Sequence, residues 1–172
     1  NYEEHLALLG ECDLVIEAIA ERIEWKHDLY KKIAAHVAPG ATLASNTSGI
    51  PIHKLAEALP DNLKARFCGV HFFNPVPVMG LIEIIRGLAT TDATVDVVRQ
   101  YGETLGKQLV FANDAPGFIV NRVARPYYAE ALRLATRRSS SSTAVTVPNC
   151  TRRPRTSTGA VPGRSGALMT PD

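Results

Sequence analysis

Short apolar segments alternate along this chain with longer segments in which apolar residues recur at helical spacing. The apolar segments are rich in β-branched and aromatic residues and predict strands over 12–18, 42–45, 67–73, 81–85 and 108–111. The segments between them predict a helix over about 22–37, a short helix after Pro51 and a helix over 94–105. This alternation favours an α/β fold with a mostly parallel sheet covered by helices on both faces.

A last helix is predicted to begin at Asp114 or Ala115, with Pro116 in its first turn, and to run through Tyr127. Proline is accepted in the first turn of a helix because its missing N–H would have no helical partner there. Pro126 falls inside the same segment and is expected to kink the helix.

The composition changes abruptly near Arg137. The chain is 45% hydrophobic and 21% charged, as in globular proteins, but residues 137–172 hold six of its 19 basic residues and one of its 17 acidic residues. That segment has no aromatic residue and no helical period, so we predict a disordered basic tail. A nucleic-acid-binding arm is disfavoured because no aromatic side chain is placed to stack on bases. The Arg, Ser, Thr and Pro bias also fits a frame-shifted translation.

The cysteines and the hydropathy pattern exclude several protein classes. Cys12, Cys68 and Cys150 are odd in number and form no C-x-x-C pair, so neither a disulfide framework nor a zinc site is indicated. We therefore expect no metal and a reducing compartment, most simply the cytoplasm. No apolar run approaches the roughly 18 residues of a membrane span, so no membrane association is expected.

Polar residues follow two of the predicted strands, at Ser45–Ser48 and His71–Asn74. Ligands of open α/β sheets bind beyond the carboxyl ends of the strands. If residues 67–85 double back about Pro77 through a wide loop, His71 and Glu83 lie opposite each other. A carboxylate beside an imidazole fixes its tautomer and increases its basicity, as a general base requires.

The alternative is a hydrogen-bonded core histidine at position 71 and an edge-strand carboxylate at position 83 that faces water. Ser48 and Asn121 favour the functional interpretation, because they add neutral hydrogen-bonding groups in or beside apolar segments. Four such groups suit a site that binds a hydroxyl or carbonyl oxygen and moves a proton.

Four long motifs give the chain a strong resemblance to a known family. They are Ala-Ser-Asn-Thr-Ser at 44–48, Val-His-Phe-Phe-Asn-Pro-Val-Pro-Val-Met at 70–79, Leu-Ile-Glu-Ile-Ile at 81–85 and Asp-Ala-Pro-Gly-Phe-Ile-Val-Asn-Arg at 114–122. From about residue 12 to residue 135, the chain resembles the 3-hydroxyacyl-CoA dehydrogenase family.

The resemblance implies NAD-dependent oxidation of an (S)-3-hydroxyacyl-CoA to the 3-ketoacyl-CoA, as in fatty-acid β-oxidation. His71 would be the general base and Glu83 the carboxylate that orients it, while Ser48 and Asn121 would hold the substrate oxygen. The positions matching NAD contacts are Glu21, Lys26, Ser48 and Asn74. For Glu21 and Lys26 taken alone, a solvated helix face is the alternative interpretation.

The chain departs from the family at both ends. It contains no G-x-G-x-x-G motif, and few residues precede the first predicted strand. We therefore expect an incomplete Rossmann-like NAD-binding domain over 1–113, the start of a helical domain over 114–136 and the disordered tail over 137–172. The family suggests a homodimer formed by the helical domain, most of which is absent here.

Such a fragment is expected to be weakly active or inactive as a dehydrogenase. The alternatives are a noncatalytic remnant and a related NAD-dependent hydroxy-acid dehydrogenase.

Overall fold

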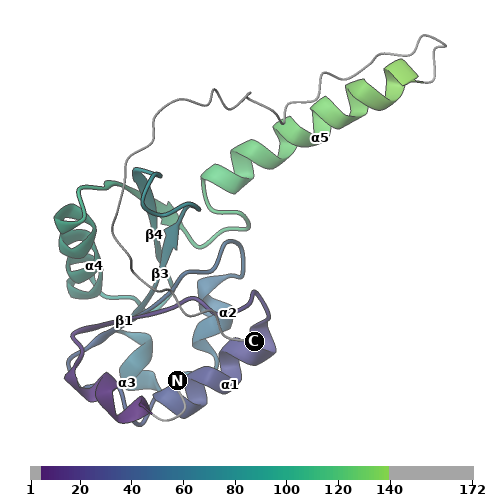
Figure 1. Ribbon diagram of the computed structural model, residues 1–172. Coiled ribbons are helices and arrows are strands. Elements are labelled where there is room, and N and C mark those ends of the chain that lie inside the picture. Colours follow the sequence, from purple (N-terminus) through teal and green to yellow (C-terminus); the bar gives the residue numbers. More distant parts are fainter. Residues whose placement is uncertain (1–4, 140–172) are drawn as a thin grey trace, which may run out of the picture. The chain divides into compact units, whose positions relative to one another are not determined.

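The computed structural model describes residues 5–139 and confirms the predicted alternation of strands and helices (Figure 1). One compact unit extends to Arg133 and contains every strand. In chain order the elements are η1 (Leu6–Glu11), β1 (Leu14–Glu17), α1 (Ile23–Ile33), β2 (Thr42–Ser45), α2 (Ile52–Ala56), α3 (Asp61–Lys64), β3 (Phe67–Phe72), β4 (Leu81–Arg86), α4 (Asp92–Thr104), β5 (Gln108–Asn113) and α5 (Val120–Ser139).

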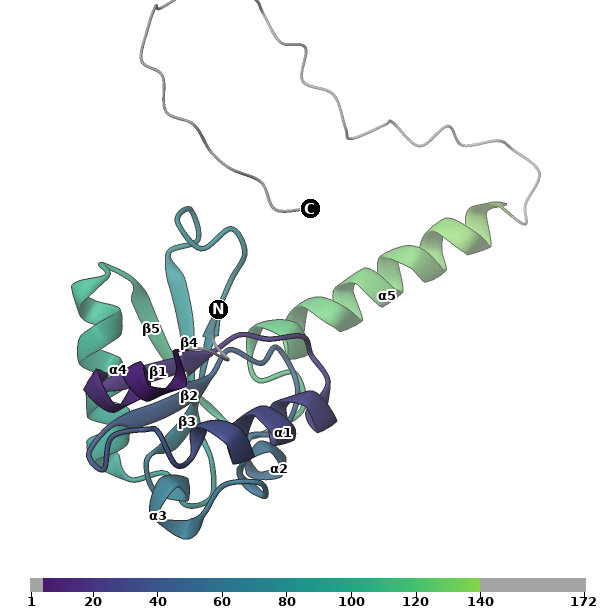
Figure 2. The ribbon, with the colours of Figure 1, turned by 60° about the horizontal axis from the view of Figure 1, so that its bottom comes forward.

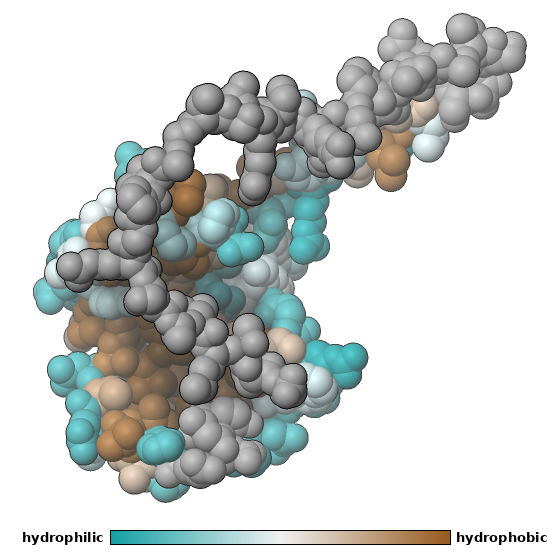
Figure 3. Space-filling view, viewed as in Figure 1, coloured by the Kyte–Doolittle hydropathy of each residue, from teal (hydrophilic) through white to brown (hydrophobic). Residues whose placement is uncertain are grey.

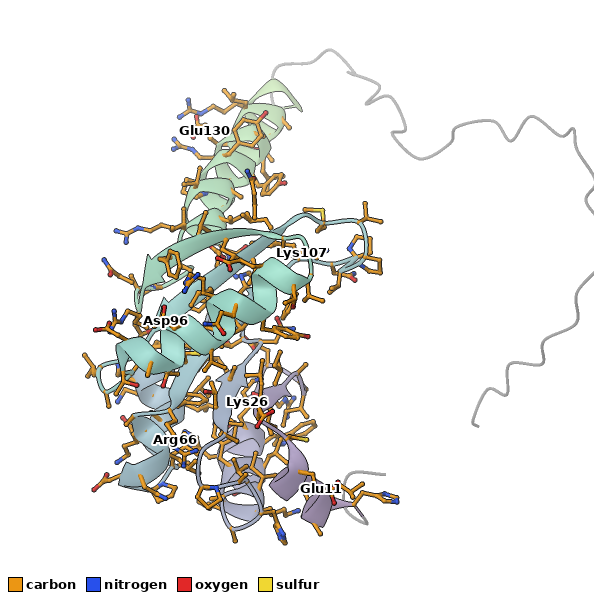
Figure 4. The ribbon with its side chains drawn as sticks, turned by 90° about the vertical axis from the view of Figure 1, so that its left-hand side faces the viewer. Glu11, Lys26, Arg66, Asp96, Lys107 and Glu130 are labelled. Atoms are coloured by element: carbon orange, nitrogen blue, oxygen red, sulfur yellow. The ribbon has the colours of Figure 1, made fainter. Side chains whose placement is uncertain are left out.

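The strands form one five-stranded sheet in the order β1-β2-β3-β4-β5. All neighbours pair in parallel except β3 and β4, which are antiparallel and place His71 opposite Glu83. The loop that joins β3 to β4 is wide, as its prolines predict. Lys107 stabilises this loop, because its Nζ donates hydrogen bonds to the carbonyls of Val76 at 2.7 Å and Met79 at 2.8 Å (Figure 4).

Helices cover both faces of the sheet, as predicted (Figure 2). Residues of α1, α2 and α3 pack with Leu43, Phe67 and Ile85 on one face, and Val98 of α4 packs with Ile82 and Ile84 on the other. Neighbouring residues of a strand point to opposite faces, so β4 contributes to both clusters. Every residue of β2 is buried, as in strands that are covered on both sides.

The described sheet has β1 and β5 as its edge strands. Beside β1 lies an apolar groove of about 280 Å³. Its lining includes Leu6, Leu9, Val15, Ile16, Leu29 and Ile33. Figure 3 shows apolar residues gathered on the face that carries β1 and η1. Unpaired edge backbone beside an apolar groove favours association with other strands.

The helix predictions need two corrections near their ends. The first helix stops at Ile33 instead of continuing to about Val37. The last helix begins at Val120, because Gly117 and Phe118 have φ angles of 76° and 49° and a helix cannot pass through that left-handed region. Residues 115–118 form a turn instead, in which the Phe118 N–H donates to the Ala115 carbonyl at 2.9 Å.

The helix α5 includes Pro126 and extends through residues 137–139, so the predicted start of the disordered tail is wrong by three residues. The rest of the predicted tail, 140–172, lies outside the described residues. In the part of the chain that the structure describes, no helix has the length and apolar content needed to cross a membrane.

Candidate active site

The antiparallel pairing of β3 and β4 brings His71 and Glu83 together on one face of the sheet. His71 Nδ1 lies 2.7 Å from Glu83 Oε2, and the two side chains are 5% and 0% exposed. The predicted juxtaposition is therefore confirmed. The alternative of a water-facing carboxylate on an edge strand is wrong, because β4 is an interior strand and Glu83 is fully buried.

The other oxygen of Glu83 is held by the start of α5. Glu83 Oε1 accepts hydrogen bonds from the backbone N–H groups of Ile119 and Val120, each at 2.9 Å. The positive end of the helix dipole favours a negative charge at this position. Both carboxylate oxygens thus have fixed partners, and the side chain keeps one orientation.

This arrangement determines which nitrogen of His71 is basic. A carboxylate can only accept, so Nδ1 carries the proton in the neutral ring and Nε2 carries the lone pair. Within residues 5–139, Nε2 makes no hydrogen bond. Two aromatic rings flank the imidazole, Phe73 at 4.5 Å and Phe118 at 5.8 Å between centroids. The result is an imidazole held in one orientation between aromatic side chains, an arrangement that suits a general base.

Asn121 and Ser48 join this pair through α5. The Asn121 side-chain amide donates from Nδ2 to the Ser48 carbonyl at 2.9 Å. Asn121 directly follows Val120, whose backbone N–H binds Glu83. The four predicted groups therefore form one connected series. Ser48 is exposed, and neither its hydroxyl nor Asn121 Oδ1 makes a hydrogen bond within the described part of the chain. Both atoms are free to bind a substrate oxygen or its hydroxyl proton.

Glu21 is held at the carboxyl end of β2. Its Oε1 accepts from the Thr47 hydroxyl at 2.5 Å and from the backbone N–H groups of Ser48 at 2.8 Å and Gly49 at 3.2 Å. Burial raises the pKa of Glu21, but these hydrogen bonds and the positive charge of Lys26 outweigh it and hold the pKa below its usual range. Its side chain remains 44% exposed, so Glu21 is anchored and also reaches the surface.

Lys26 lies inside the protein, so its interpretation as part of a solvated helix face is wrong (Figure 4). Its side chain is 0% exposed, and Nζ lies 2.6 Å from Glu17 Oε1 and 3.6 Å from Glu21 Oε2. Glu17 accepts three further hydrogen bonds, from the Ile19 N–H at 2.7 Å and from the Tyr30 and Ser45 hydroxyls at 2.8 Å each. Burial and the charge of Glu17 raise the pKa of Tyr30.

Sequence reasoning missed this Glu17 cluster, which comprises Glu17, Lys26, Tyr30 and Ser45. A signal for it exists, because Glu17 ends an apolar strand as a lone acidic residue, just as Glu83 interrupts another. A carboxylate in such a place needs a partner. The partner cannot be identified from spacing, because Lys26 and Tyr30 come from α1 and Ser45 from β2.

Asn74 is not brought into either group. It lies exposed in the loop between β3 and β4, and its side chain makes no hydrogen bond within residues 5–139. The same residues contain no group of three His, Cys, Asp or Glu side chains that could hold a metal ion.

The fold and the site define a Rossmann-like α/β domain with a buried histidine–glutamate pair near the carboxyl end of a strand. The sequence profile of the 3-hydroxyacyl-CoA dehydrogenase NAD-binding domain matches residues 1–115. The chain therefore belongs to the 3-hydroxyacyl-CoA dehydrogenase family, and the resemblance of its motifs is confirmed.

Individual relatives of the chain agree with this family assignment. The chain is 48% identical over 124 residues to a probable 3-hydroxybutyryl-CoA dehydrogenase of Deinococcus radiodurans, with 72% of this chain and 44% of that protein covered. It is 43% identical to the mitochondrial hydroxyacyl-coenzyme A dehydrogenase of Sus scrofa, with 78% and 42% covered. A crystal structure of 3-hydroxybutyryl-CoA dehydrogenase from Escherichia coli K12 superposes with a TM-score of 0.71 at 44% identity, with 76% of this chain and 27% of that chain covered. The chain thus spans less than half the length of these relatives.

Proposed function

We propose that this chain provides the catalytic base and part of the NAD site for oxidation of an (S)-3-hydroxyacyl-CoA to the 3-ketoacyl-CoA. The observation that carries the proposal is the buried contact of 2.7 Å between His71 and Glu83, which leaves Nε2 as the basic nitrogen. Membership of the family supports the choice of substrate class.

In this mechanism His71 Nε2 accepts the proton of the substrate C3 hydroxyl. Glu83 faces the imidazolium that forms, and it keeps its orientation because its other oxygen is held by two backbone N–H groups. The Ser48 hydroxyl and the Asn121 amide orient the substrate oxygen toward Nε2. A bound NAD would supply the acceptor for the hydride that leaves C3.

The exposed polar groups near the carboxyl ends of the strands fit part of NAD. The side chain of Glu21 is 44% exposed, and Ser48 and Asn74 are exposed, so a carboxylate, a hydroxyl and an amide are available for ribose and carboxamide groups. Lys26 has no exposed surface, and we propose that it contributes to this site through its charge beside Glu21. The 172 residues contain no glycine-rich phosphate loop, so the fit covers the residues named and not the pyrophosphate.

The proposal extends to the surroundings of the reaction. The family's name concerns hydroxyacyl-CoA, which supports an acyl-CoA partner. From the resemblance of the motifs we also propose a place in fatty-acid β-oxidation and a homodimeric whole protein. Cys12 and Cys68 are free thiols, which agrees with a reducing compartment such as the cytoplasm.

The test uses His71→Gln in a family dehydrogenase whose corresponding segment is replaced by residues 5–133 of this chain. We expect turnover, followed as NADH absorbance, to fall by about 10²–10⁴-fold, because general bases contribute that much to rate. NAD affinity, measured by calorimetry, should change little. The control is His36→Gln, which alters an exposed histidine outside the site. Unchanged turnover in His71→Gln would remove this residue from the mechanism.

A further inference from the structure

Asp114 lies at the end of the sheet away from His71. It follows β5, whose last residue, Asn113, pairs with Arg86, and Arg86 pairs with Cys68 near the start of β3. His71 lies near the other end of β3. Residues 114–118 therefore return across the sheet before Ile119 and Val120 reach Glu83.

The start of this connection, residues 114–118, is fastened to α2 by one side chain. Asp114 Oδ1 accepts from the Ile52 N–H at 2.8 Å, and Oδ2 accepts from the His53 N–H at 2.8 Å and lies 2.6 Å from His53 Nδ1. The Asp114 side chain is only 8% exposed. A buried carboxylate with three close partners has little freedom to move.

The end of the connection touches both members of the catalytic pair. Phe118 is 3% exposed, and its ring contacts the imidazole of His71 edge-on. The next two residues supply the N–H groups bound by Glu83. Phe118 has a φ of 49°, a conformation that non-glycine residues adopt at a cost, so its surroundings must enforce it.

We propose that Asp114 is a positioning residue for the His71–Glu83 pair. By fixing the start of the connection 114–118, it determines where the end of that connection contacts the two side chains. This inference rests on the proposed role of His71 as base. While Asp114 is hydrogen-bonded to α2, the strained turn has one conformation, which places the Phe118 ring against His71 and the two N–H groups against Glu83. When it is released, the bonds to Glu83 must hold the turn alone.

A purely structural alternative is that Asp114 caps α2, whose N-cap residue Pro51 has no capping side chain. The two roles predict different responses. A cap alone affects the amides of α2, whereas a positioning residue also affects Ile119, Val120 and the proton on His71 Nδ1.

The experiment compares hydrogen exchange and ¹⁵N-histidine NMR spectra of the full chain and of Asp114→Asn. The asparagine amide cannot accept from all three donors of α2. We expect exchange at the Ile119 and Val120 amides to rise at least about tenfold, with β3 amides unchanged and the His71 Nδ1 proton signal weakened. Unchanged exchange at these two amides, or an equal rise throughout β3, would overturn the proposal.

Two further variants complete the design. Asp61→Asn is the matched control, since Asp61 opens α3 with a side chain 97% exposed and should leave all these signals unchanged. If Asp114→Asn does not fold, His53→Gln removes one of the three contacts and should produce the same local pattern at smaller size; no change there contradicts the proposal. Neither NAD nor substrate is used, so failure here is separate from failure of the turnover test.

Discussion

Two buried glutamates, on strands that β2 and β3 separate in the sheet, have different kinds of partner. Glu17 at the end of β1 holds the ammonium of Lys26, two hydroxyls and one backbone N–H. Glu83 in β4 holds one imidazole and two backbone N–H groups. Both side chains are almost without exposure, and both carboxylates are fully hydrogen-bonded.

The difference lies in the chemistry of the main partner, which is an ammonium for Glu17 and an imidazole for Glu83. Lys26 and Glu17 form a buried ion pair, and the same ammonium lies 3.6 Å from Glu21, so removing one member would leave the other charge uncompensated. Imidazole is the side chain most often used to accept and donate protons, so in the proposed mechanism Glu83 orients the group that takes up the proton. Under that proposal, one buried glutamate supports structure and the other supports proton transfer.

Glu17→Gln should have the largest effect on stability. Removing one member of a buried pair leaves the other charge uncompensated, so we expect the free energy of unfolding to fall by about 3–5 kcal/mol in urea titrations. The control, Glu57→Gln, breaks an exposed pair with Lys54 and should leave the unfolding midpoint unchanged. The double variant Glu17→Gln/Lys26→Met removes both charges and should be more stable than the single variant. Equal stability of the two would contradict the assigned ion pair.

Glu83→Gln should lower the free energy of unfolding less than Glu17→Gln does, and its main effect should be on turnover. The amide oxygen can still accept from Ile119 and Val120, so we expect a loss of about 1–2 kcal/mol on unfolding. The amide NH₂ then faces His71 Nδ1, which favours the tautomer with its proton on Nε2, and turnover in the family dehydrogenase carrying this segment should fall about 10²–10⁴-fold. Histidine ¹⁵N shifts report the tautomer directly. A stability loss as large as that of Glu17→Gln would show that the two carboxylates do not differ in this way.

The sequence was sufficient for the parts of the molecule that depend on local pattern. Strand and helix alternation predicted the α/β sheet, and symmetry about Pro77 predicted that His71 faces Glu83. The Glu17 cluster was not predictable, because its members come from three elements, β1, α1 and β2, and the spacing of residues does not encode how these elements pack. The start of α5 was also missed, because positive φ angles at Gly117 and Phe118 convert a plausible first helical turn into a tight turn.

Glu21 provides an intermediate case and the smallest expected effect. Its folded pKa lies below the usual range of a glutamate, so its contribution to stability is present above the pKa of an unfolded glutamate and is lost as the pH falls through the folded pKa. The side chain is 44% exposed, so solvent screening keeps this contribution below about 1 kcal/mol. Thr47→Val removes one lowering hydrogen bond and should raise the pKa of Glu21 in a ¹³C-carboxyl NMR titration, whereas Thr47→Ser keeps the hydroxyl and should leave the pKa unchanged. If the pKa of Glu21 is equal in both variants, the backbone N–H groups of Ser48 and Gly49 hold its carboxylate without help from Thr47. Glu21 would then resemble Glu83, which backbone N–H groups also hold, more closely than it resembles Glu17.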